Sequence, residues 1–76
     1  MALRLSLEFA VARAGPVRIG VYDITGREVA VVTDGWRAAG RYAMQWNANG
    51  GLAAGVYLVR LVAPDRSLTR RFVLVR

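Results

Sequence analysis

The chain has 76 residues and a formal net charge of +6, and all eleven of its basic residues are Arg. It contains no Cys and no His, which excludes disulfides, zinc fingers, haem or iron–sulfur ligation, and Ser–His or Cys–His catalytic pairs. A chain of this length forms one domain, over residues 1–76, that only an apolar core can stabilise, and a hydrophobic content of 55% excludes disorder.

Alternation of apolar and polar residues predicts six short β-strands. The pattern is clearest at residues 3–9, where every second residue is Leu or Phe. The other predicted strands lie at 17–22, 28–32, 41–46, 56–63 and 68–75. The breaks carry turn residues: Gly15-Pro16, Asp23 with Gly26, Asp34-Gly35, Gly40, the Asn-rich segment 47–51, and Pro64-Asp65. Short connections and alternating faces predict an all-β fold, an antiparallel sandwich or open barrel.

Polar residues of the chain predict no catalytic or cofactor site. The Asp residues fall at turns, where the side chain bonds its own backbone, and we expect Glu28 to form a solvated pair with Arg27. Ser and Thr residues have no His or Lys to act as a base, so we predict that the chain is not an enzyme. No loop holds the several carboxylates that a hard-cation site requires, and we expect no metal and no cofactor.

The arginines are spread along the chain, at about one per strand or turn, which is typical of a solvated outer face. We therefore expect no specific nucleic-acid partner, because such sites gather their cations and aromatic residues on one surface. No apolar run approaches the length of a membrane-spanning helix, about 20 residues, and we expect no membrane insertion. Trp36, in a predicted loop, either caps one end of the sandwich or contacts a partner.

The last predicted strand is apolar on both faces. Leu68, Phe72 and Leu74 alternate onto one face, and Val73 and Val75 onto the other. Arg70 and Arg71 fall one on each face, and with Arg76 they are the only concentrated charges. Such a strand is either central in its sheet or covered by something outside the domain, and it is a natural site for pairing with another chain.

Several segments, in order, resemble the type A C-terminal sorting domains of the bacterial type IX secretion system. Residues 21–29, VYDITGREV, are similar to the family pattern V-Y-D/N-x-x-G-R/K-x-V, and 39–46 match its next loop and strand. Residues 52–61, LAAGVYLVRL, resemble L-x-x-G-V-Y-x-x-R-L. Residues 69–76, TRRFVLVR, resemble the terminal strand, although the family usually carries Lys where this chain has Arg70 and Arg71.

The resemblance implies an immunoglobulin-like sandwich of six to seven strands at the end of a longer secreted or cell-surface protein, which travels by way of the periplasm. It implies a non-catalytic sorting and anchoring module, whose partner is the secretion translocon. We expect recognition at the chain end, by Arg70, Arg71, Phe72, Val73, Leu74, Val75 and Arg76. Gly26, Gly40 and Gly55 are expected to serve turns. The alternative is a self-assembling structural module, similar to the immunoglobulin-like part of the flagellar hook-capping protein, whose edge strands pair between copies.

Overall fold

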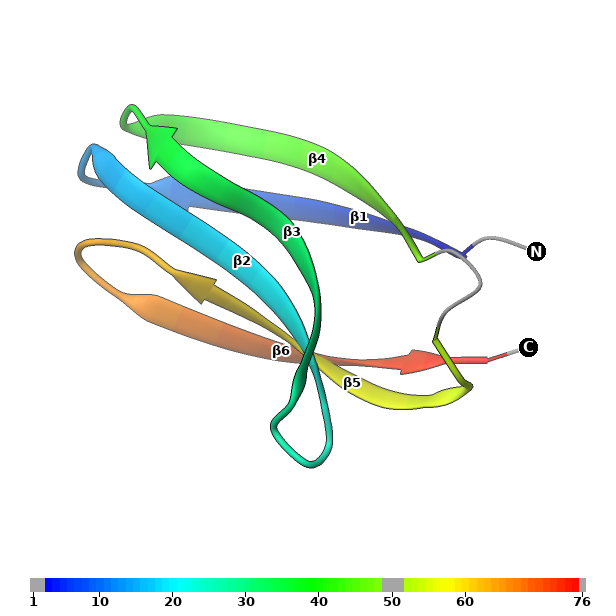
Figure 1. Ribbon diagram of the computed structural model, residues 1–76. Helices are drawn as coiled ribbons and strands as arrows, with labels where there is room; N and C mark the ends of the chain where they lie inside the picture. The colour runs from blue at the N-terminus through cyan, green and yellow to red at the C-terminus, as the bar shows by residue number, and fades with distance from the viewer. Residues whose placement is uncertain (1–2, 49–51, 76) are drawn as a thin grey trace.

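The computed structural model describes residues 3–48 and 52–75 and contains six β-strands in two antiparallel sheets. The strands are β1 (Leu3–Val11), β2 (Gly15–Asp23), β3 (Glu28–Arg37), β4 (Gly40–Ala48), β5 (Gly55–Val62) and β6 (Ser67–Leu74). β1 and β4 form a two-stranded sheet that lies over a four-stranded sheet of order β3-β2-β5-β6 (Figure 1). The predicted all-β antiparallel sandwich is confirmed.

The core lies between the sheets and is built mainly by the two central strands of the larger one. Inward-facing Val17, Ile19 and Val21 of β2 and Tyr57, Val59 and Leu61 of β5 are all buried. Alternate residues of β1 and β4, among them Leu7 and Met44, are half-buried and pack against them from the opposite sheet. Period-two patterning places one set of side chains in this layer and leaves the other set in solvent.

The turn between β2 and β3 is organised by Asp23. Its carboxylate oxygen Oδ1 accepts hydrogen bonds from the backbone N–H groups of Thr25, at 2.9 Å, and Arg27, at 3.1 Å. Its backbone N–H donates to the Arg27 carbonyl at 2.9 Å, which closes the loop. Gly26 has a φ of 90°, in the left-handed region that a residue with a Cβ avoids. The expectation that this Asp bonds its own backbone is confirmed.

Strand β3 differs from its sequence prediction. It was expected to end at residue 32, with Asp34-Gly35 as a break, but it continues to Arg37 because its last residues pair with Gly15–Arg18 of β2. Trp36 therefore lies in a strand at the sheet edge and is 69% exposed, so the interpretation as a cap on the sandwich is wrong. Gly15-Pro16, expected as a break, likewise lies inside a strand, β2.

We predict that two glycine substitutions distinguish backbone strain from steric crowding by an added Cβ. A Cβ at Gly26 or at Gly35 would meet no atom within 4 Å, yet only Gly26 has a left-handed φ. Gly26→Ala should lower the free energy of unfolding by about 1–2 kcal/mol. Gly35→Ala should leave it unchanged or raise it by about 0.5 kcal/mol. Urea denaturation of both variants checks this, and equal losses in the two would contradict the assignment.

Candidate functional site

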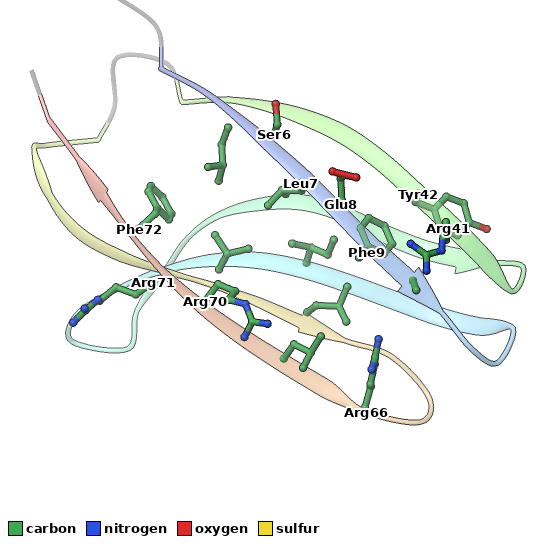
Figure 2. Close-up of a pocket in the computed structure, with 16 residues that line it drawn as sticks. Ser6, Leu7, Glu8, Phe9, Arg41, Tyr42, Arg66, Arg70, Arg71 and Phe72 are labelled. Carbon is green, nitrogen blue, oxygen red and sulfur yellow. The ribbon is translucent and has the colours of Figure 1, made fainter.

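The recognition residues expected at the chain end lie on β6, which is an edge strand of the larger sheet. β6 pairs with β5 so that Leu68, Arg70 and Phe72 each lie opposite a buried residue of β5. These buried partners are Leu61, Val59 and Tyr57. Residues directly opposite in an antiparallel pair share a face. Arg70 therefore starts from the inner face of the sheet, and Arg71 starts from the outer face. Their side chains leave β6 in opposite directions (Figure 2).

Two of the expected recognition residues serve the core. Leu74 is buried, and the Phe72 ring stacks on Tyr57 with centroids 5.7 Å apart. Trp46 of β4 meets the same Phe72 ring edge-on at 6.5 Å, which joins the two sheets at this end. The Tyr57 hydroxyl donates a hydrogen bond of 2.6 Å to the Ala53 carbonyl. Phe72 and Leu74 consequently hold β6 in place, and substitution of either one would disturb packing as well as any surface.

The other face of β6 exposes an apolar patch with one cation, which we call the outer patch: Arg71, Val73, Val75 and the neighbouring Val56. Val73 is 59% exposed and Val75 73%, and Val56 lies directly opposite Val73 on β5. These large apolar side chains are contiguous with Arg71 along the outside of β6. Contiguous exposed apolar surface is where proteins contact partners. Arg76, which we also expected to contribute, lies outside the described residues.

A groove of about 560 Å³ opens between β1 and β6, on the side where the small sheet leaves the large one uncovered (Figure 2). We call it the β1–β6 groove. Its apolar lining comes from both sheets and reaches the core: Leu5, Leu7, Phe9, Leu61, Leu68 and Phe72. Its polar lining is mostly cationic, with Arg41, Arg66, Arg70 and Arg71 against a single acid, Glu8. Among the residues that the structure describes, none of these four arginines makes an ion pair.

The opposite side of the sandwich is closed by Arg37 of β3. Its guanidinium carbon lies 4.9 Å from the centre of the Tyr42 ring and 5.8 Å from that of Phe9, and these two rings stack at 5.3 Å. Arg37 Nη2 also donates a hydrogen bond of 3.0 Å to Thr33 Oγ1. Cations over aromatic faces are attracted by the ring quadrupole. Arg37 thus ties β3 to both strands of the small sheet.

Three of the five acids are engaged away from the groove. Glu28 accepts two hydrogen bonds from the Arg18 guanidinium, at 2.5 and 2.8 Å, and Asp34 lies 3.6 Å from Arg18 Nε. The expected pairing of Glu28 with Arg27 is wrong, because Arg27 forms an ion pair with Asp23 in which Nε lies 3.4 Å from Oδ2. The paired charges therefore gather on β2 and β3 and the turn between them, whereas the arginines of the groove have no ion pair among the described residues. Cross-strand register brings Arg18 to these acids, and register cannot be read from neighbours in sequence.

The bonded carboxylates titrate below their ordinary range. The Thr25 hydroxyl, followed by the backbone N–H of Arg27, holds the pKa of Asp23 below its usual value. The Arg18 guanidinium, through its hydrogen bonds, does the same for the pKa of Glu28. Both groups bind protons more weakly in the folded chain than in the unfolded one. Their contribution to stability is complete above the unfolded pKa, about 4, and is lost as the pH falls through the lower folded values.

We predict that Asp23→Asn flattens this pH dependence. The amide oxygen of Asn can still accept the turn hydrogen bonds, but the side chain no longer titrates. The free energy of unfolding of the variant should fall less steeply than that of wild type below about pH 4. Urea denaturation over a pH series measures it. Asp65→Asn, in the β5–β6 turn and without a side-chain hydrogen bond among the described residues, is the control. Identical pH profiles for Asp23→Asn and wild type would contradict the prediction.

Within residues 3–48 and 52–75, no three His, Cys, Asp or Glu side chains gather in a way that could hold a metal ion. The same part of the chain contains no helix long and apolar enough to cross a membrane.

The sequence matches the family model described as the secretion system C-terminal sorting domain over residues 3–75. The match includes every strand described above and both candidate surfaces on β6. No curated protein and no solved structure matches the chain significantly.

Proposed function

The chain belongs to the family of type IX secretion C-terminal sorting domains, and we propose that it is a non-catalytic module that directs an attached cargo protein through the outer membrane. The cargo of such a tail is a secreted or cell-surface protein. In the proposal, residues 1–76 are the C-terminal module of a longer chain that reaches the translocon from the periplasm. The module presents the end of β6 to the export machinery after it has folded.

The observation that carries this proposal is the exposure of the outer patch on a strand that belongs to an otherwise packed domain. Phe72 and Leu74 on the inner face of β6 pack in the core, so this part of the strand is fixed and its outer face is displayed in one register. Arg71 supplies a permanent positive charge beside exposed valines, and Arg70 supplies a second one at the other face. A fixed strand with a cation and an apolar run can be recognised without unfolding.

The alternative function, a self-assembling module that pairs through its edge strands, would use the same exposed elements. Four of the six strands, β1, β3, β4 and β6, are edges of their sheets. Copies that each carry a net charge of +6 repel one another, and unpaired arginines line the groove between the β1 and β6 edges that self-pairing would use. The charge distribution therefore supports a different partner over a second copy.

We predict that Arg70→Glu/Arg71→Glu abolishes export. A reporter with a signal peptide, fused ahead of the 76-residue chain in a bacterium with type IX secretion, should be found in the periplasm instead of at the surface or in the medium. Reversal of both charges replaces attraction to the machinery by repulsion. Arg70→Lys/Arg71→Lys keeps both charges and should be exported normally. Fractionation and immunoblotting of the reporter measure this.

The matched control is Arg13→Glu/Arg60→Glu, which makes the same change in net charge at exposed positions outside β6 and should be exported. Thermal unfolding of the purified chains establishes that each variant folds. Normal export of a folded Arg70→Glu/Arg71→Glu chain would contradict the proposal, as would equal loss of export in the control.

A further inference from the structure

We propose that the β1–β6 groove receives an extended segment of a partner protein, which pairs with the free edge of β1 and places a carboxylate against Arg70. The inference rests on the proposed function only in taking this partner to be part of the export machinery. It assigns the site of contact and the chemistry of the occupant, which the exposure of the outer patch leaves open.

The first observation is geometric. Residues 5–10 of β1 all line the groove, a run that spans roughly 17 Å in an extended strand. β4 pairs along one edge of β1, and no strand among the described residues pairs along the other. Alternate residues of a strand direct their backbone groups to opposite edges, so half of the N–H and C=O groups of β1 point toward the groove. A long apolar groove beside an open strand edge fits an added strand better than a compact ligand.

The second observation is what an added strand would cover. A third strand beside β1 would lie over β6, whose inner face presents Leu68, Arg70 and Phe72 at every second position. Leu68 and Phe72 are only half-buried although they face the core side. The side chains of the occupant that face β6 would then be apolar, charged and apolar in turn. Two strands are a minimal sheet, and a third one would complete the cover of the larger sheet.

The third observation is the charge of this side. Arg70 has one hydrogen bond among the described residues, a long one of 3.5 Å to the carbonyl of Thr69. An inward-pointing charge on an edge strand discourages pairing with an apolar strand, because that cation would be buried without a partner. A strand with a carboxylate at the matching position removes this penalty. Two other groove arginines, Arg41 and Arg66, favour the same acidic occupant and disfavour a second copy of this basic chain.

The test uses a synthetic peptide, acetylated and amidated, of sequence Thr-Val-Thr-Glu-Thr-Val-Thr, in which Val, Glu and Val share one face. Two matched peptides carry Gln or Lys in place of Glu. We expect the Glu peptide to bind the 76-residue chain about tenfold more tightly than the Gln peptide, the effect of one hydrogen-bonded charge pair. The Lys peptide should bind more weakly still. Hydrogen exchange should show that the Glu peptide protects backbone amides of β1.

Variants of the chain test whether the carboxylate of the Glu peptide lies against Arg70. Arg70→Glu should reverse the order, so that the Lys peptide binds better than the Glu peptide. Arg70→Gln, for use if the charge reversal does not fold, should bind the Glu and Gln peptides equally. Arg60→Glu makes the same charge change on the outer face of β5 and should keep the wild-type order. The preference for Glu is thereby assigned to Arg70 and separated from the overall charge of the chain.

Four outcomes would overturn the inference: no binding of the Glu peptide, equal binding of Glu and Lys peptides, protection of β3 instead of β1, or a dimer in sedimentation that buries the β1 edge. Suppose that the peptide does not bind, that the wild-type chain exports the reporter, and that Arg70→Glu/Arg71→Glu abolishes export. The proposed sorting function would then stand without this groove. The reverse result, peptide binding with no effect of Arg70 or Arg71 on export, would remove their proposed role in sorting and keep the groove as a strand-binding site.

Discussion

The structure depends on one constraint, which is that a two-stranded sheet has to cover a four-stranded one. The central strands β2 and β5 receive that cover, and their inward residues are buried. At the edges the cover is unequal. Arg37 draws β3 to the small sheet through the Tyr42 and Phe9 rings. β6 is paired with β5 along its whole length, but its ring contact with the small sheet lies at one end, where Phe72 meets Trp46. The side between β1 and β6 consequently remains open, and it reaches the core.

The charges of the domain also differ between the β3 side and the β1–β6 side. The acids on β2 and β3 are taken up by Arg18 and by the turn that Asp23 organises, so that side of the molecule is close to neutral. The arginines of the groove outnumber its single acid, Glu8, so this side of the molecule carries a positive excess. In a small domain without cysteines, stability has to come mainly from the apolar core, and surface charges are free to serve recognition. A basic chain of this kind discriminates among partners by charge before any contact forms.

The sequence predicts what local patterning controls and no more. Period-two alternation is enough to place six strands, and it shows that Arg70 and Arg71 lie on opposite faces. The turn at Asp23 is equally local, because its donors are two and four residues away. The length of β3 is not local: Asp34-Gly35 has the composition of a turn, and only pairing with β2 keeps it extended. The groove depends on which strands are neighbours across space, and neither hydrophobic pattern nor charge count contains that order.

In the proposed function, the two faces of β6 let one strand pack in the core and carry the recognised surface. A recognition element in a mobile tail loses conformational entropy on binding, about 1–2 kcal/mol for each residue that becomes ordered. β6 has lost that entropy already, because Phe72 and Leu74 hold it against the core. Its outer valines and its two arginines are therefore presented in a fixed register. Under this proposal, a partner that binds the strand recognises the folded state itself, and a cargo whose tail has not folded presents neither the outer patch nor the β1–β6 groove.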